Sequence, residues 1–583
     1  MAKLIISEKS PRHPGEWSRL WNQQEVTDVL RDKSGTKEVE GLVVGFPDLL
    51  SPSISTEAFA NMKKLRLLQL YNVQLNGEYK HLPKELIWLC WNECPLKSIP
   101  DDFFDQPRLV ILEIKYSKLV QVWEGSKSLK NLKILDFSGC SDLEKSPDLS
   151  NLPSLEELIL EWCESLSEIH PSIGHLKKLS LVNLTGCKNL ISLPGDFYRS
   201  KSVQTLVLDF CGQFSELSED LGNMISLRVL KAYETAIRQV PRSTVRLKNL
   251  THLSLGLTNL THLQFPDSLL SLDFLRNLDL SSNDFHTLPS LSGLSKLENL
   301  WLGYCHNLHT IYGLPTNLKF LDASRCYRLI TMPNFSKMSN IRELNVRDSH
   351  ALTEVPDLDK SLNSMTWIDM TYCAELTADF MRKVLKGWTS CGYGGIFLNG
   401  NYVPDWFEFV NDGNKITFDI PPSDGCNFEG LTLLCFYCSS PSQFGPYIRC
   451  KDSHPLARID INNTKRTELR TCISKEDWVI KMRDCYAKKR KNLMRDVVYK
   501  ECFLWQGQIS NDKLNLQSGD TVDITFEMPE PYVTLDNVTI KGTGVNLVWD
   551  KPMKENEHDF DGDGGFLIQR HNQGGDASSS SHV

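Results

Sequence analysis

Few residues of this sequence have the types and spacing that chemistry requires. Asp559, Asp561, Asp563 and Gly564 follow the pattern with which a calcium-binding loop begins. Position twelve of that loop would be Arg570, whereas the site needs a glutamate that binds calcium through both oxygens. We therefore interpret this acidic segment as part of a disordered tail, rich in Gly, Asp and Ser, that begins at about residue 551.

The cysteines do not indicate a metal site. Cys435 and Cys438 form a CxxC pair without a convincing second pair, and strand alternation would bury one and expose the other. The 17 cysteines are an odd number in a large chain, so we expect reduced thiols. No nucleophile–base motif is found, and the GxxxxGK[ST] phosphate-binding loop is excluded because no Gly-Lys dipeptide occurs. The sequence thus predicts no catalytic residue, cofactor, metal or enzyme activity.

One basic cluster interrupts an acidic chain, and it consists of Lys488, Lys489, Arg490 and Lys491. It fits a nuclear-import signal, a docking patch for an acidic partner, or a solvated loop. The formal charge of −9 excludes a broad nucleic-acid-binding surface. The longest apolar run is about eight residues, against the ~20 that span a membrane, and no signal-peptide core is present. We expect a cytoplasmic location, or a nuclear one if the cluster acts in import.

A repeat organises the middle of the chain. The pattern LxxLxL recurs about fourteen times at spacings of 21 to 25 residues, within the leucine-rich repeat range. Three residues after the LxL of seven repeats stands a cysteine, and once Asn283, where a small polar group turns the chain out of a strand. Prolines such as Pro194 and Pro241 close many repeats and exclude a long helix there. The first positions of the repeats are Leu65, Leu86, Leu109, Leu132, Leu155, Leu179, Val203, Leu227, Leu250, Leu275, Leu297, Leu318, Ile341 and Met365.

The fold class that follows is an α/β leucine-rich-repeat solenoid with a parallel sheet on its concave face and an irregular or 3₁₀ convex side. Each repeat buries its leucines against its neighbours, and the residues around LxL point outward because strand side chains alternate. The outward set is acidic and aromatic, so we expect a protein partner, favoured if basic. Our candidate partner-binding residues are Trp88, Glu113, Asp136, Glu157, Glu161, Asp209, Tyr233, Asp279, Trp301, Phe320, Asp322, Glu343, Arg347, Trp367 and Asp369.

Two alternatives stay open for these residues. Any single acid is better explained as a solvated side chain without a partner. Trp301, Phe320, Arg347 and Trp367 either form an interface or pack against the domain that follows. That domain is predicted as an all-β sandwich, because short alternating runs at 395–398, 415–420, 431–438, 457–461, 501–509, 521–526 and 538–549 are separated by Gly, Pro, Asn and Asp.

Several segments resemble plant TIR-NBS-LRR intracellular immune receptors. The run Leu-Pro-Lys-Glu-Leu-Ile-Trp-Leu-Cys-Trp at 82–91 resembles their repeats, and the first 45 residues resemble the segment that links their nucleotide-binding module to the repeats. Residues 394–407, which include the motif Pro404, Asp405, Trp406 and Phe407, and residues 544–549 resemble their post-repeat jelly-roll or Ig-like domain. The resemblance implies a linker remnant at 1–55, repeats at 56–385, a β-sandwich at 386–550 and a tail at 551–583.

The same resemblance implies the function. Such receptors carry TIR and nucleotide-binding modules that this chain does not show, so we expect a fragment, a truncated product or a sensor-only form. The repeats and the sandwich would bind a pathogen effector or a guarded host protein, and in a full-length receptor this would relieve autoinhibition. The alternatives are an adaptor or decoy that pairs with a full-length receptor, an extracellular repeat binder, and a carbohydrate-active jelly roll.

Overall fold

The computed structural model describes residues 13–45, 53–258, 260, 272–388, 394–400, 402–423, 425–439, 456–462, 465–470, 501–527 and 538–550. The basic cluster at 488–491 and the acidic tail after 551 lie outside these ranges. The chain separates into two compact units, Met1–Ala351 and Leu352–Val583, which we describe one at a time. The domain boundaries that the sequence suggests, including the one near 385, stay predictions.

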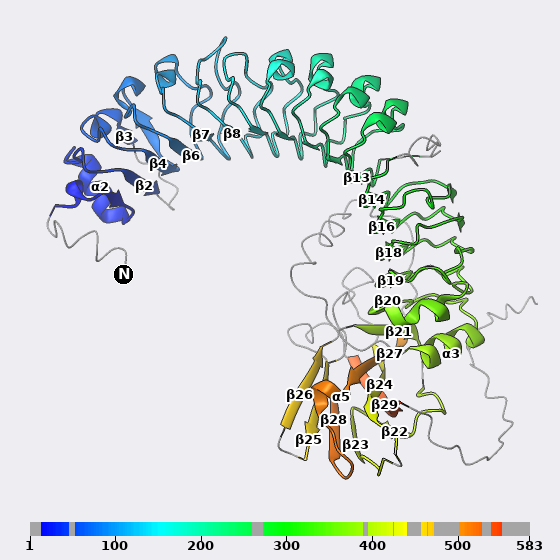
Figure 1. Ribbon diagram of the computed structural model, residues 1–583. Coiled ribbons are helices and arrows are strands. Elements are labelled where there is room, and N and C mark those ends of the chain that lie inside the picture. Colours follow the sequence, from blue (N-terminus) through cyan, green and yellow to red (C-terminus); the bar gives the residue numbers. More distant parts are fainter. Residues whose placement is uncertain are drawn as a thin grey trace, which may run out of the picture. The chain divides into compact units, whose positions relative to one another are not determined.

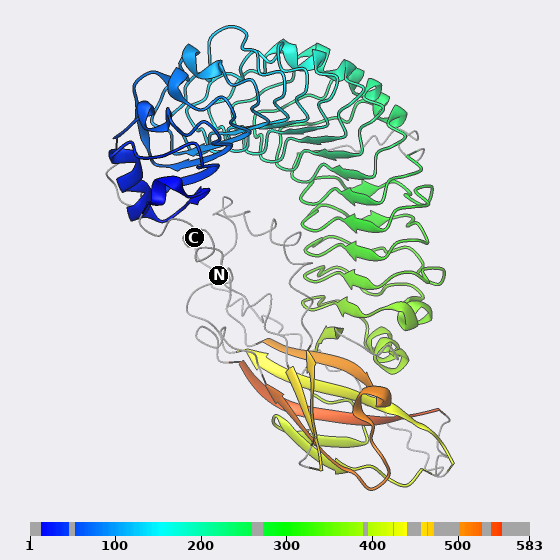
Figure 2. The ribbon, with the colours of Figure 1, turned by 60° about the vertical axis from the view of Figure 1, so that its left-hand side comes forward.

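The first unit is a stack of parallel strands, one from each repeat (Figures 1 and 2). Every strand pairs with the strands of the repeats before and after it, as in the pairing of Leu206 with Val182 and Leu230. The strands are β4 (Leu67–Tyr71), β6 (Trp88–Asn92), β7 (Ile111–Glu113), β8 (Ile134–Asp136), β9 (Glu157–Ile159), β10 (Leu181–Asn183), β11 (Thr205–Val207), β12 (Val229–Lys231), β13 (His252–Ser254), β14 (Asn277–Asp279), β16 (Asn299–Trp301), β18 (Phe320–Asp322) and β19 (Glu343–Asn345). These positions confirm the predicted repeats.

The repeat leucines hold this stack together. Leu135, Leu158 and Leu206 are fully buried, and so are their counterparts in the other repeats. At about 25 cal/mol per Å² of apolar surface, each such leucine contributes roughly 1.5–3 kcal/mol to folding. Because every repeat packs only on its neighbours, the stack is stabilised rung by rung.

The sheet begins before the first repeat that periodicity detects. Strands β1 (Arg19–Leu20) and β2 (Gly41–Gly45) are parallel, and β2 pairs with β4. Between them lies helix α2 (Gln23–Arg31), whose first turn is capped because the Asn22 side chain accepts hydrogen bonds from the N–H groups of Gln24 and Glu25. These segments extend the repeat sheet, although they lack the LxxLxL pattern.

Short 3₁₀ helices lie on the side of the repeats opposite the sheet (Figure 1), as the sequence predicts. Four of these helices begin at a proline, whose fixed φ suits the residue before the helix or the first helical residue. Pro100, Pro194 and Pro241 are N-caps, and Pro171 is the first residue of its helix. The helices are η1 (Pro14–Glu16), η2 (Thr56–Phe59), η3 (Tyr79–His81), η4 (Asp101–Phe104), η5 (Pro171–His175), η6 (Gly195–Arg199), η7 (Glu219–Asn223) and η8 (Arg242–Arg246), with two strand pairs, β3 (Ser53–Ser55) with β5 (Gln74–Asn76) and β15 (Thr287–Leu288) with β17 (Thr310–Ile311).

A ladder of thiols closes the turn after six of the described strands. The thiol of Cys187 donates to the carbonyl of Leu160 in the preceding repeat at 3.1 Å, and Cys211 donates to Leu184 at 3.0 Å. At the same position, the Asn283 amide donates to the carbonyl of Leu255 at 2.8 Å. The cysteines therefore replace a consensus asparagine as buried donors, and burial raises the pKa of Cys211 to about 12.

The second unit starts with one more repeat strand and a helix. Strand β20 (Trp367–Asp369) follows η10 (Leu358–Ser364) and runs parallel to β21 (Gly395–Asn399), and α3 (Ala378–Gly387) lies between the two strands. Thr377 caps α3, since its hydroxyl accepts from the N–H of Phe380 at 3.3 Å. Phe380, Met381, Val384 and Leu385 form the buried side of this helix.

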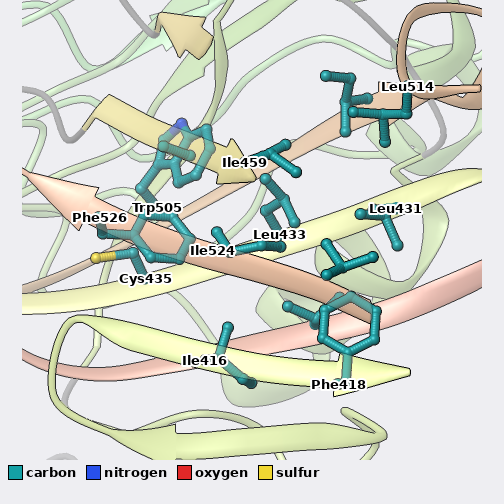
Figure 3. Packing of buried hydrophobic residues seen from close by; sticks show 14 of the residues in the cluster. Ile416, Phe418, Leu431, Leu433, Cys435, Ile459, Trp505, Leu514, Ile524 and Phe526 are labelled. Atoms are coloured by element: carbon teal, nitrogen blue, oxygen red, sulfur yellow. The ribbon is translucent and has the colours of Figure 1, made fainter. Parts of the chain in front are cut away.

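Two layers of antiparallel strands complete the second unit. One layer continues from β21 through β27 (Glu501–Ser510), β24 (Phe428–Ser439) and β29 (Val538–Trp549) to β22 (Phe409–Asp412). The other contains β23 (Lys415–Asp419), β28 (Thr521–Glu527), β25 (Leu456–Ile461) and β26 (Lys465–Arg470), and the short helix α5 (Asn511–Leu514) precedes β28. Side chains such as Phe418, Leu433 and Trp505 meet in a shared core (Figure 3).

Candidate protein-binding surface

The aspartates of the predicted surface are structural. Asp209 is 1% exposed and accepts the Tyr233 N–H of the next repeat at 2.9 Å. Asp136, Asp322 and Asp369 are also buried, and each accepts the N–H two residues further on at 2.9–3.0 Å. Asp279 accepts the N–H of Ser281 at 3.0 Å in the same way. A carboxylate that accepts a hydrogen bond from a buried N–H stabilises the end of the strand. The prediction that these side chains are exposed was wrong for Asp136, Asp209, Asp322 and Asp369.

A closed polar network occupies the first repeats of the face. The indole Nε1 of Trp88 donates to Glu113 at 2.7 Å, and Lys115 Nζ lies 3.0 Å from Glu113 and 2.9 Å from Asp136. Burial lowers the pKa of Lys115, but its hydrogen bonds to Asp136 and Glu113 outweigh burial and raise that pKa overall. Lys115 thus pairs with both acidic candidates, which the sequence positions alone do not reveal.

Three aromatic candidates are buried instead of exposed. Tyr233, Phe320 and Trp367 are each about nine-tenths buried. Trp367 belongs to the sandwich core, where its ring lies 6.3 Å from that of Phe397. Of the two alternatives for Trp367, an interface or packing against the following domain, the structure shows packing. Trp301 is half-buried, and its ring lies 5.4 Å from that of Phe320.

Four polar candidates keep partly exposed side chains on the sheet face. Glu157, Glu161, Glu343 and Arg347 are half-buried. Glu161 accepts a hydrogen bond from the Asn183 amide of the next repeat. These side chains, with Trp301, retain the access to solvent that a contact with a partner requires.

One column of residues with positive φ runs along the ends of the strands. It occupies the position directly before the thiol ladder, and the N–H groups there bond to carbonyls of the next repeat, as from Trp162 to Thr185 at 2.6 Å. Left-handed backbone costs a non-glycine residue about 1–2 kcal/mol, so glycine is the natural occupant. In the first unit the column consists of Asn72, Glu93, Tyr116, Gly139, Trp162, Gly186, Phe210, Glu234, Leu257, Ser282, Tyr304, Arg325 and Asp348.

Aromatic rings in this column cover the glycines that follow them. A Cβ added to Gly139 would lie 2.4 Å from the Tyr116 ring, and one on Gly186 would lie 2.4 Å from the Trp162 ring. The Trp162 ring continues to Phe210 at 5.8 Å, and Phe210 reaches Tyr233 at 5.7 Å. We call Tyr116, Trp162, Phe210 and Tyr233 the aromatic strip. Sequence reasoning missed its first three members, because the LxL pattern does not mark the residue beyond the strand.

The post-repeat motif packs within the second unit. Phe407 and Pro404 are buried, and the N–H of Phe407 donates to the Pro404 carbonyl at 3.2 Å. Phe407 lies against the closing strand, where a Cβ on Gly544 would be 3.0 Å from its ring. Trp406 is half-buried beneath Lys386 of α3, at 5.1 Å, while Asp405 is exposed.

A disulfide corrects one expectation about the cysteines. Cys438 and Cys502 face each other on β24 and β27 and are disulfide-bonded. Cys435 and Cys438 are both buried, whereas one of them was expected to be exposed. Cys435 points into the sandwich core, and Cys438 lies on the other face of its strand, which is also covered. Alternation was right about direction but could not show what covers each face.

The described residues hold neither a metal-binding cluster nor a membrane-spanning helix. There, no group of three or more His, Cys, Asp and Glu side chains is placed to hold a metal ion. None of the helices within the described ranges has both the length and the apolar character needed to cross a bilayer.

The fold defines the class of protein. No family model matches the chain. A leucine-rich repeat protein of Leptospira interrogans has a similar structure, with a TM-score of 0.52 and 21% identity over 67% of this chain and 98% of that chain. Together with the stacked strands, this likeness makes the chain a leucine-rich repeat protein.

Sequence relatives place the chain more narrowly. It is 32% identical over 501 residues to disease resistance protein RPS6 of Arabidopsis thaliana, covering 74% of this chain and 43% of that protein. Disease resistance-like protein DSC1 of the same plant is 27% identical, with 71% and 43% covered, and TMV resistance protein N of Nicotiana glutinosa is 26% identical, with 63% and 36% covered. The chain belongs to the family of plant TIR-NBS-LRR disease resistance proteins, and it spans less than half the length of these relatives.

Proposed function

We propose that this chain acts in plant defence as a recognition module that binds a pathogen effector or a guarded host protein. The observation that carries this proposal is the repeat sheet, an ordered face on which partly exposed Glu157, Glu161 and Trp301 are held by a leucine-packed stack. A rigid surface reduces the ordering cost of binding. The names of its relatives support the role in defence.

The proposed mechanism is binding without a reaction. In a full-length receptor, contact of the effector with the repeats and the sandwich would relieve autoinhibition of the nucleotide-binding and TIR domains. The chain's own contribution is affinity and specificity, and no step of chemistry is assigned to its residues. Membership of the family supports a cytoplasmic location as part of this proposal, and the cluster at 488–491 remains a proposed import signal.

Binding of the purified chain to a panel of purified effector proteins, measured by biolayer interferometry, tests the proposal. We expect at least one effector to bind with micromolar or better affinity, and the variant Glu157→Lys/Glu161→Lys to weaken that binding at least tenfold. Lys248→Glu, on the exposed turn after η8, is the matched charge reversal off the sheet face and should bind normally. Equal binding by the double variant would contradict the use of the face.

The adaptor alternative predicts a different result. A shortened receptor that pairs with a full-length relative would co-purify with a TIR-bearing chain and bind no effector by itself. Co-expression of the tagged chain with a full-length relative, followed by size-exclusion chromatography, separates the two. If the two chains form a stable complex without any effector, and no effector of the panel binds the chain, the adaptor role is favoured over the sensor role.

A further inference from the structure

Two members of the aromatic strip combine backbone strain with exposure. Trp162 and Tyr116 adopt left-handed backbone, with φ of 56° and 54°, and their side chains are 43% and 66% exposed. Gly139 and Gly186 occupy the same column, so glycine is compatible with this position of the repeat. Large side chains that keep an unfavourable backbone and yet stay in water are explained poorly by packing alone, and strained positions concentrate at binding sites.

Another aromatic residue of the same column, Tyr304, has a cation over its ring, which within the described residues Trp162 and Tyr116 do not. In the later repeats the Tyr304 ring carries the Arg325 guanidinium at 4.9 Å, and Asp348 holds that guanidinium at 3.2 Å. Arg325 thus makes a cation–π contact with Tyr304 and an ion pair with Asp348 within the chain. Among the described residues, no cation lies over Trp162 or Tyr116 in this way.

The charges around the strip are acidic. Glu93 and Glu234 are exposed and stand in the same column on either side of the aromatics, and Glu161 directly precedes Trp162. Two of the neighbouring lysines are already paired: Lys115 with Glu113 and Asp136, and Lys188 with Glu164 at 2.7 Å. Lys118, two residues after Tyr116, and Lys231, two residues before Tyr233, add positive charge at the two ends of the strip.

We propose that the aromatic strip docks an extended, arginine-bearing segment of the partner protein, with a guanidinium on the Trp162 ring and the flanking glutamates as its counter-charges. Tyr116 and Phe210 lie four rungs apart, about 19 Å at ~4.8 Å per strand, which roughly six extended residues span. Arginine satisfies both features of the strip, because it stacks on aromatic faces and keeps its charge. This inference rests on the proposed function, since it names the chemistry of the partner.

The probe is a fluorescein-labelled decapeptide of alternating Arg and Val, titrated with the purified full chain and followed by fluorescence anisotropy. Its counterparts carry citrulline, which is neutral with nearly the same shape, or Glu in place of Arg. We expect the Arg peptide to bind at least tenfold more tightly than the citrulline peptide, and the Glu peptide not to bind. Raising the salt concentration should weaken the Arg peptide alone.

Trp162→Gly is the decisive variant, because glycine suits the left-handed backbone and should leave the fold intact. It should lose at least tenfold in affinity for the Arg peptide, and Glu161→Gln should lose affinity for the Arg peptide but not for the citrulline peptide. Ser282→Gly, in the same column outside the strip, is the matched control and should bind like wild type. Equal binding by Trp162→Gly, or equal affinity for Arg and citrulline peptides, would overturn the proposal.

The strip and the proposed function can fail separately. If an effector binds wild type and Trp162→Gly equally, the recognition role stands and the strip has no part in it. If the Arg peptide binds at the strip but no effector or guarded protein binds the chain, the strip stands and the recognition role falls. Binding of a neutral oligosaccharide such as chitohexaose, lost in Trp162→Gly, would reassign the strip to sugars and overturn the inference.

Discussion

Removal of the Asp209 carboxylate tests whether the acids of the sheet face are structural. The side chain is 1% exposed and accepts the N–H of Tyr233 at 2.9 Å, across the boundary between two repeats. Asp209→Ala leaves that buried N–H without this acceptor. A hydrogen bond to a charged group contributes about 1.5–3 kcal/mol, and a buried donor left unsatisfied costs about 1–3 kcal/mol. We therefore expect the free energy of unfolding to fall by about 2 kcal/mol.

Two matched variants isolate the cause. Asp209→Asn keeps an oxygen that can accept from Tyr233 and should cost less than about 1 kcal/mol. Glu157→Ala, on the same face but half-buried, should change the free energy of unfolding by no more than about 0.5 kcal/mol.

The assay is urea unfolding followed by far-ultraviolet circular dichroism, together with hydrogen exchange of peptides that contain the Tyr233 amide. A loss of 2 kcal/mol corresponds to roughly 30-fold faster exchange, because about 1.4 kcal/mol is a factor of ten. If Asp209→Ala and Glu157→Ala have equal stability and equal exchange at Tyr233, the carboxylate is no structural cap and the reasoning fails.

Three further predictions concern the strain, the thiols and the sandwich. Trp162→Gly relieves left-handed strain while it loses ring contacts, so its free energy of unfolding should lie within about 1 kcal/mol of wild type, whereas Leu158→Ala should lose about 2–5 kcal/mol; equal losses in urea unfolding would contradict the strain. Burial raises the pKa of Cys140 and Cys211 to about 12, so at pH 8 the reactive thiolate is scarce and iodoacetamide should spare both until urea unfolds the chain; rapid native labelling, seen by mass spectrometry, would refute this. Gly544→Ala places a Cβ 2.7 Å from Val403 and 3.0 Å from Phe407, so it should destabilise the second unit by about 1–3 kcal/mol, and an unchanged unfolding curve would show that the motif is loosely packed.

The periodic part of the fold was predictable because packing enforces it. Three apolar positions per repeat are needed to bury each strand on its neighbours, and these positions stand in the sequence as LxxLxL. The thiol ladder was predictable for a similar reason, because a small buried donor recurs at one place in many of the repeats. The sandwich strands followed from alternation and from the turn residues between them.

The surface could not be predicted to the same depth. Alternation gives the direction of a side chain but not its partners, so Asp209 and Glu157 looked equivalent although one is an internal cap. Strands β1 and β2 lack the leucine pattern because they lie at the end of the stack. The disulfide of Cys438 and Cys502 depends on the antiparallel register of β24 with β27, and no local pattern encodes that register.

Recognition through the aromatic strip is tested most directly by hydroxyl-radical footprinting of the chain with and without a bound effector. Tyr116 and Tyr312 are both 66% exposed, and only Tyr116 belongs to the strip, so Tyr312 is an internal reference. The account predicts that oxidation of Tyr116 and Trp162 falls several-fold in the complex while oxidation of Tyr312 stays constant. Unchanged oxidation of Tyr116 and Trp162 in a saturated complex would contradict it.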